Sequence, residues 1–121
     1  MIGIGIDTVD VPRFRKVAAR TPGIIDRLFT DAERTYCERR KDPTERYAAR
    51  FAAKEAVMKA MGVGVGACKW REIEVVRERS GQPTVSLTGG AAALAGRKGV
   101  TGWRLSLTHT ETVAEAVAVA L

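Results

Sequence analysis

The chain has 121 residues, of which 45% are hydrophobic and 28% charged, and its formal net charge is +6. This length suits a single domain over residues 1–121 with one modest core. No apolar run approaches the roughly 20 residues of a membrane helix, and the short apolar start does not resemble a signal peptide, so we expect a cytoplasmic protein without a membrane partner. The positive charge predicts an acidic partner, and charge alone does not choose among nucleic acid, an anionic cofactor, a membrane surface and an acidic protein.

Cysteine and histidine are scarce in this chain. Cys37 and Cys68 stand alone, and His109 is the only histidine. A zinc site built from cysteine and histidine is therefore nearly excluded, whereas a magnesium-type site built from carboxylates stays open. We expect both cysteines to be reduced and to pack as small apolar side chains.

The first half of the chain predicts one strand and three helices. The alternation that begins the chain indicates a strand that ends near Asp7, and Asp10 is placed to cap the helix that follows. Thr30 and Glu33 form a capping-box pattern, and Gly62 is a natural helix stop. The predicted elements are a strand at 2–10 and helices at about 12–20, 30–40 and 43–61.

The second half predicts two antiparallel hairpins with one helix between them. The turns fall at residues 80–83 and 110–112. The alternating C-terminal strand could supply a free edge for pairing between chains. The predicted elements are strands at 72–79, 84–87, 103–109 and 113–121 and a helix at about 89–98. Strands and helices in separate blocks with antiparallel pairs predict an α+β fold.

The helix predicted at 43–61 carries two charged side chains of interest. Glu55 lies only about 40° around the helix from Phe51, which belongs to an apolar stripe with Tyr47, Met58 and Met61. Lys59 follows Glu55 by four residues and stands beside it. The pair is either an ordinary surface Glu–Lys contact or a carboxylate and a lysine presented to an anionic ligand.

Asp7 at the end of the first strand is open to two interpretations as well. Aspartate at such a position often caps a helix or forms an Asx turn. Alternatively, Asp7 and Glu55 together supply the one or two carboxylates that Mg²⁺ takes from a protein before water and phosphate oxygens complete its shell.

Two further features are weak by themselves. The loop Gly62-Val-Gly-Val-Gly66 could hold phosphates through its backbone amides, but it follows a helix and has neither Rossmann nor P-loop spacing. His109 ends a strand, where it is either structural or a hydrogen-bonding partner of a phosphate. No arrangement of residues indicates a protein nucleophile.

Taken together, five segments resemble the holo-acyl-carrier-protein synthase family, the small bacterial 4′-phosphopantetheinyl transferases. The resemblance covers essentially the whole chain in order. One departure is Ala49, where many relatives have glycine, and it concerns helix packing. The segments are GIDTVDVPRF near the start, RLFTDAE at 27–33, RFAAKEAVMKAMGVGVG at 50–66, EIEV at 72–75 and SLTHT at 106–110.

The resemblance implies an activity and its partners. Such an enzyme moves 4′-phosphopantetheine from coenzyme A to a serine of an acidic apo acyl carrier protein for lipid biosynthesis and releases adenosine 3′,5′-bisphosphate. It requires Mg²⁺, and the small members of the family are homotrimers with sites between protomers. Phosphoryl-type transfer depends on positioning and charge stabilisation rather than on a covalent intermediate with the protein.

The resemblance also implies residue roles. Asp7 and Glu55 match the metal carboxylates, and Lys59 matches the lysine beside the transferred phosphate. Either Glu55 or a metal-held water would accept the proton of the carrier serine. The residues assigned to the coenzyme A site are Arg50, Lys59, Gly62, Gly64, Gly66 and His109. The carrier-binding residues are Arg13, Arg27 and, on the same basic first helix as Arg13, Arg20.

Two other functions are compatible with the composition. A basic nucleic-acid-binding module fits a pI near 9.8, although only 6% of the residues are aromatic and no nucleic-acid motif is present. A non-catalytic coenzyme A-binding protein is the second alternative, and the presence of Asp7, Glu55 and Lys59 argues against it.

Overall fold

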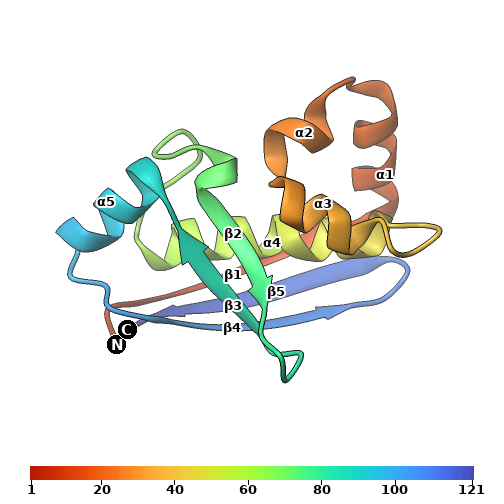
Figure 1. Ribbon diagram of the computed structural model, residues 1–121. Coiled ribbons are helices and arrows are strands. Elements are labelled where there is room, and N and C mark those ends of the chain that lie inside the picture. The colour runs from red at the N-terminus through yellow and green to blue at the C-terminus, as the bar shows by residue number, and fades with distance from the viewer.

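The computed structural model describes residues 1–121 and forms two β-sheets with helices packed against them (Figure 1). No helix is both long and apolar enough to pass through a bilayer. The elements in chain order are β1 (Gly3–Asp10), α1 (Val11–Arg20), α2 (Ile24–Leu28), α3 (Asp31–Cys37), α4 (Thr44–Ala60), the 3₁₀ helix η1 (Trp70–Glu72), β2 (Ile73–Arg77), β3 (Pro83–Leu87), α5 (Gly89–Arg97), β4 (Trp103–His109) and β5 (Val113–Ala120).

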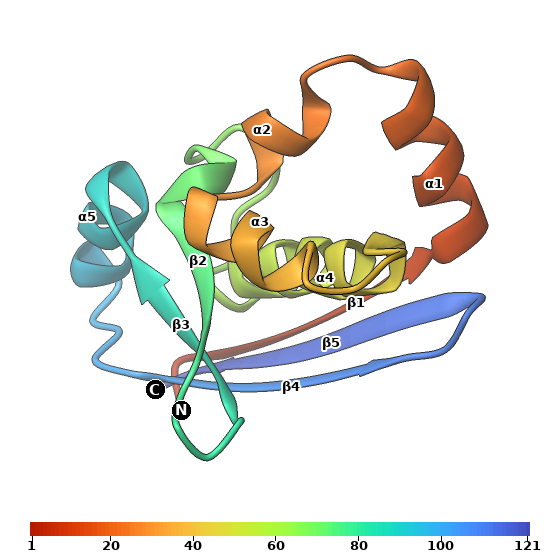
Figure 2. The same cartoon turned by 45° about the vertical axis from the view of Figure 1, so that its right-hand side comes forward.

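The larger sheet has three antiparallel strands in the order β1-β5-β4, and β2 and β3 form a separate hairpin. Helix α4 runs along one face of the larger sheet, and α1, α2 and α3 gather around one end of α4 (Figures 1 and 2). No element of the chain covers the other face. The side chains of β5 alternate accordingly, with Ala114, Ala116, Ala118 and Ala120 buried toward α4.

Strand β1 and helix α4 approach each other backbone to backbone. A Cβ added to Gly3 would lie 1.9 Å from the carbonyl oxygen of Ala60, and one added to Gly5 would lie 2.0 Å from the carbonyl oxygen of Ala56. Any residue other than glycine would therefore push the strand and the helix apart. Gly3 and Gly5, which alternate with isoleucines at the start of the chain, are thus required by the packing of β1 on α4.

Helix α4 is enclosed on most sides. Tyr47, Met58 and Met61 of the predicted apolar stripe are buried, and Phe51 is half-buried. Many of the remaining positions are alanines that are also buried, so the helix has no fully polar face. Its short side chains let the sheet and the other helices come close to its backbone.

One buried ion pair links three parts of the fold. Lys54 on α4 and Glu33 on α3 are both fully buried and lie 2.7 Å apart, measured from Nζ to Oε1. Lys54 also donates to the carbonyl oxygens of Trp70 and Ile73, and Glu33 accepts from the backbone N–H of Val75. The pair therefore ties α3, α4 and the start of β2 together.

The predicted α+β class is confirmed, and so are the Asp10 cap and the Thr30–Glu33 capping box. The structure adds α2, a five-residue helix that the sequence pattern did not predict. Strand β1 continues past Asp7 to Asp10. The prediction that the C-terminal strand forms an edge was wrong, because β5 lies between β1 and β4 and both of its edges are paired.

Breaking the Lys54–Glu33 pair should destabilise the protein strongly. We expect Lys54→Met to lower the free energy of unfolding by about 3–5 kcal/mol, because Glu33 is left as a buried charge without its partner. The measurement is urea unfolding followed by circular dichroism. As a control, Arg15→Ala removes the exposed Arg15–Asp42 pair and should cost about 1 kcal/mol or less. Equal losses of unfolding free energy in the two variants would contradict a structural role for the Lys54–Glu33 pair.

Candidate functional site

Asp7 lies within β1 and faces α4, on the same side of the strand as Gly5. Its side chain is only 11% exposed. The position pairs with Ala116 of the central strand β5. The interpretation of Asp7 as a cap or Asx turn was wrong, since Asp10 caps α1 by accepting from the N–H of Arg13.

Lys59 contacts Asp7 directly. Its Nζ donates to Asp7 Oδ1 at 2.9 Å and to the carbonyl oxygen of Ile6 at 3.1 Å. The hydrogen bond to Asp7 and the charge of Asp7 raise the pKa of Lys59 above its ordinary value. The interpretation of Glu55 and Lys59 as a simple surface pair was therefore wrong, because Lys59 reaches across to the neighbouring strand.

Glu55 completes this group. Partial burial raises the pKa of Glu55 to about 7, and the negative charge of Asp7 and a hydrogen bond to it add to the effect. Lys59 acts in the opposite direction. Two carboxylates held together in a partly dry site repel each other, so one of them tends to keep its proton unless a cation joins them. The site is thus prepared to take up positive charge.

The carboxylates line a hollow of about 470 Å³ between β1, α1, α2 and α4. Asp10 also borders it but is occupied as a helix cap, which leaves Glu55 and Asp7, whose Oδ1 accepts from Lys59, as the candidate ligands. Nowhere in the structure do three or more histidine, cysteine, aspartate or glutamate side chains gather as a ligand group. Two carboxylates in an open hollow suit Mg²⁺, which completes its shell with water and phosphate oxygens.

Arg50 and His109 meet in a different hollow, of about 260 Å³, on the other side of α4. Arg50 is 4% exposed, and its Nε is buried without a hydrogen-bond partner. His109 Nδ1 lies 2.9 Å from Glu45 Oε1. This hollow shares no residue with the one around Asp7 and Glu55. The predicted site residues therefore form two separate groups within one chain. Asp7, Glu55 and Lys59 make up one group, and Arg50 and His109 make up the other.

The predicted glycine loop follows α4 directly. Gly62 lines a third hollow, of about 450 Å³, together with Lys59. Gly62 and Gly66 have φ of 74° and 100°, a left-handed conformation that favours glycine, while Gly64 and Gly66 are exposed. The loop therefore extends the surface that begins at Lys59 and does not reach the hollow of Arg50.

The basic residues assigned to a partner surface lie on the two helices beside the carboxylate hollow. Arg13 lines it. Arg20 at the end of α1 and Arg27 on α2 are exposed, and both helices contribute walls to the same hollow. Of the three arginines, Arg13 therefore borders the hollow of Asp7 and Glu55, and Arg20 and Arg27 lie exposed on the helices beside it.

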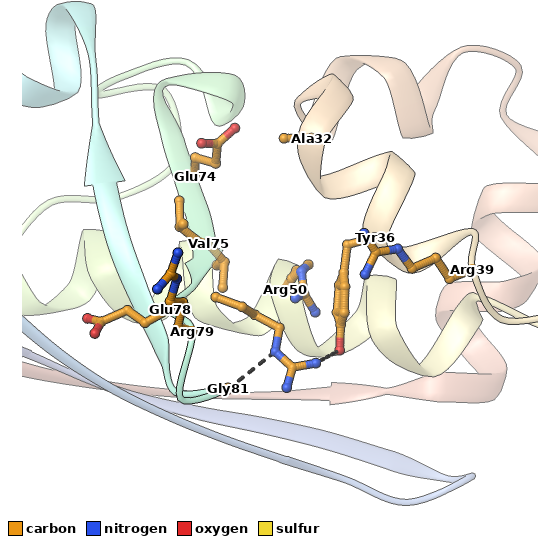
Figure 3. Close-up of a pocket in the computed structure, with 11 residues that line it drawn as sticks. Ala32, Tyr36, Arg39, Arg50, Glu74, Val75, Glu78, Arg79 and Gly81 are labelled. Atoms are coloured by element: carbon orange, nitrogen blue, oxygen red, sulfur yellow. Dashed lines mark hydrogen bonds between the residues drawn. The ribbon is translucent and has the colours of Figure 1, made fainter.

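The sequence interpretation missed the residues around Arg50. Tyr36, Arg46 and Arg77 line the same hollow as Arg50 and His109. A neighbouring hollow of about 510 Å³ lies between α3 and the β2–β3 hairpin, and Figure 3 shows Tyr36 and Arg50 side by side in it. These side chains come from α3, α4 and β2, and no short-range pattern predicts that they meet.

The family model described as 4′-phosphopantetheinyl transferase superfamily matches residues 3–119 of the chain. A holo-[acyl-carrier-protein] synthase of Desulforudis audaxviator is 49% identical over 122 residues, which covers 100% of this chain and 93% of the relative. This similarity extends over the full chain and includes every element described above.

Solved structures of the same kind of protein share the fold. Holo-[acyl-carrier-protein] synthase from Neisseria meningitidis superposes with a TM-score of 0.89 at 29% identity and covers 100% of this chain and 98% of its own. The enzyme from Helicobacter pylori, in complex with coenzyme A, gives a TM-score of 0.84 at 27% identity and covers 98% of this chain and 99% of its own.

Proposed function

This chain belongs to the 4′-phosphopantetheinyl transferase superfamily, and on that premise we propose that it transfers 4′-phosphopantetheine from coenzyme A to a serine of an apo acyl carrier protein. The products are the holo carrier and adenosine 3′,5′-bisphosphate. The carrier would be that of fatty acid synthesis, which places the enzyme in the cytoplasm.

The meeting of Asp7, Glu55 and Lys59 carries this proposal. Strand β1 supplies Asp7, and one turn of α4 separates Glu55 from Lys59, so three residues distant in sequence form one charged group. Two carboxylates and a lysine at the edge of an open hollow suit a pyrophosphate and its counter-ion.

Asp7 and Glu55 are the residues that would hold Mg²⁺. When bound, the ion would supply positive charge that offsets the negative charge of the reacting phosphates. Glu55 accepts the proton as the serine oxygen forms its bond to the phosphorus that carries the pantetheine arm. The bond from that phosphorus to the bridging pyrophosphate oxygen breaks, and Lys59 stabilises the departing bisphosphate.

Arg50 and His109 would hold the nucleotide end of coenzyme A. Arg50 offers a buried guanidinium with an unused N–H, and His109 lies at the mouth of the same hollow. Charged donors of this type form the strongest hydrogen bonds to phosphate oxygens.

The separation of the two groups supports a site shared between protomers. Asp7 lies on β1 and His109 on β4, and these are the two edge strands of the sheet with β5 between them. Within one chain the groups open into separate hollows. If β1 of one protomer meets β4 of the next, the two groups face each other across the interface, and each complete site takes residues from two chains.

The uncovered face of the sheet supplies the apolar surface for such an assembly. Ile4 and Ile6 are each 60% exposed, and they pair with Val119 and Val117 of β5 on the same face. A contiguous apolar patch on the open face of a sheet is typical of an interface. We therefore propose a homotrimer in which copies of this face surround the central axis.

Charge on this face should prevent assembly. We expect Ile6→Glu to convert the homotrimer into a monomer, because three carboxylates would be buried close together at the axis. The mass is measured by light scattering after size-exclusion chromatography. The control variant Ala93→Glu, on the exposed side of α5, should leave the mass unchanged. A wild-type protein that is already a monomer would contradict the proposal.

The acidic carrier would dock on α1 and α2. Arg13 lines the carboxylate hollow, and Arg20 and Arg27 are exposed on the same two helices, so a carrier held there would bring its serine to Glu55. Complementary charge mainly accelerates encounter, and its effect weakens as salt is added.

The activity is tested by the mass of the carrier. Incubation with coenzyme A, Mg²⁺ and an apo acyl carrier protein should add one phosphopantetheine arm, as read by intact mass. Asp7→Asn and Glu55→Gln should each slow the reaction at least about 100-fold, because each removes a charge that acts on the reacting phosphates. Asp10→Asn is the matched control, since asparagine also caps helices and the rate should stay near that of the wild type. Unmodified carrier with the wild-type enzyme would refute the function.

The same assay tests the docking surface. Arg27→Glu should raise the KM for the carrier and leave the KM for coenzyme A unchanged, and the wild-type rate at low carrier concentration should fall as salt is added. A salt-insensitive reaction would contradict the role of Arg13, Arg20 and Arg27.

The alternatives find no support beyond charge. The matching family model, over residues 3–119, is described as a transferase superfamily and not as a nucleic-acid-binding family. A non-catalytic coenzyme A-binding protein would not require Asp7, Glu55 and Lys59 to meet, yet the fold brings them together.

A further inference from the structure

Tyr36 on α3 is surrounded by arginines. The guanidinium carbons of Arg50 and Arg46 lie 4.1 and 4.3 Å from the centre of its ring, and that of Arg77 lies 4.9 Å away. Arg39 is more distant, at 5.8 Å. We call these five residues the Tyr36 cluster. They come from α3, α4, β2 and the turn after α3, so the tertiary fold alone brings them together.

The positive charge of the cluster has no counter-charge. None of its four arginines lies within 4.0 Å of a carboxylate, since all the ion pairs of the chain involve other residues. Arg46 donates to the carbonyl oxygen of Tyr36, and Arg77 donates to that of Gly81 and to the hydroxyl of Tyr36. Arg50 is buried, and its Nε has no partner. Guanidinium groups crowded in this way are stabilised by an anion.

Tyr36 holds these groups and leaves most of their N–H donors free, because only one nitrogen each of Arg46 and Arg77 donates to it. A guanidinium stacked on an aromatic ring is attracted through its face, so its edge N–H groups stay available for an oxyanion. Tyr36, Arg50 and Arg77 line both the 260 Å³ hollow of His109 and the 510 Å³ hollow beside α3. Figure 3 shows Tyr36 and Arg50 in the second of these hollows. The Tyr36 ring therefore lies between the two hollows, and the N–H donors of the arginines beside it can reach a ligand in either one.

We propose that Tyr36 is a positioning residue that holds Arg46, Arg50 and Arg77 for the 3′-phosphate of coenzyme A and so makes the enzyme prefer coenzyme A to 3′-dephospho-coenzyme A. This inference rests on the proposed function. The pyrophosphate belongs to Asp7, Glu55 and Lys59, and the 3′-phosphate is the one anionic group of the substrate that remains. The Tyr36 cluster is the concentration of unpaired positive charge next to His109.

The test compares two nucleotides on two variants of Tyr36. In Tyr36→Leu the platform for three guanidinium groups is lost, and we expect the KM for coenzyme A to rise about tenfold or more. The kcat should stay within about twofold, because the reacting phosphates lie elsewhere. The KM for 3′-dephospho-coenzyme A should not change, so selectivity falls. Tyr36→Phe keeps the ring and should retain most of the selectivity.

Tyr47→Phe is the matched control. Tyr47 is the other tyrosine of the chain, and its hydroxyl donates to Glu38 while its ring packs on Phe29. Loss of the Tyr47 hydroxyl should change the stability of the protein and leave the selectivity between the two nucleotides intact. A Tyr36→Leu variant that weakens both nucleotides equally, or that lowers kcat alone, would show a structural role and overturn the proposal.

Calorimetric titration with adenosine 3′,5′-bisphosphate and with adenosine 5′-monophosphate separates this inference from the proposed function, because no carrier or transfer is involved. The wild type should bind the bisphosphate at least about tenfold more tightly, and Tyr36→Leu should abolish the difference. If the wild type binds the bisphosphate preferentially but transfers no phosphopantetheine, the proposed function is refuted and the role of Tyr36 stands. Equal binding of the two nucleotides by the wild type would refute the role of Tyr36.

Discussion

The backbone contact between β1 and α4 is the constraint on which the site depends. Gly3 and Gly5 allow the carbonyl oxygens of Ala60 and Ala56 to occupy the space that side chains would fill. Asp7 follows on the same face of the strand, and Glu55 and Lys59 project from the helix beside it. The reach from Lys59 to Asp7 is possible only because the two backbones are this close. Gly3 and Gly5 therefore determine both the packing of β1 on α4 and the position of Asp7 beside Lys59.

The buried Lys54–Glu33 pair fixes the other side of α4. Lys54 precedes Glu55 directly, so the pair and the carboxylate site sit on neighbouring faces of one helix. Rotation of α4 would break the contacts of Lys54 with the backbone of η1 and β2. Removal of one partner of a buried pair is costly, whereas replacement of both by apolar side chains often is not, so we infer that the pair serves mainly to fix the orientation of α4.

Local patterns predicted a large part of this fold. The Thr30–Glu33 capping box, the Asp10 cap and the strand at 103–109 all follow from interactions within a few residues of sequence. Helix α2 was missed because five residues are too few to show a helical period. The strand predicted at 2–10 is confirmed, but its predicted end near Asp7 was wrong, because pairing with β5 carries β1 to Asp10.

The candidate site divides in the same way. Asp7, Glu55 and Lys59 were named from family resemblance, while spacing alone left a surface pair or a turn as the simpler interpretation of each. Tyr36 and its arginines gave no signal, because a cluster drawn from α3, α4 and β2 has no spacing to detect. The two groups lie in separate hollows of one chain, and the proposed trimer would unite them across the interface between two protomers.

Mixing Glu55→Gln with the double variant Arg50→Lys, His109→Ala, each inactive alone, tests the proposed shared site most directly. Random exchange of subunits in a ring of three should restore about a quarter of the wild-type activity. Activity no greater than the sum of the two separate variants would contradict a shared site.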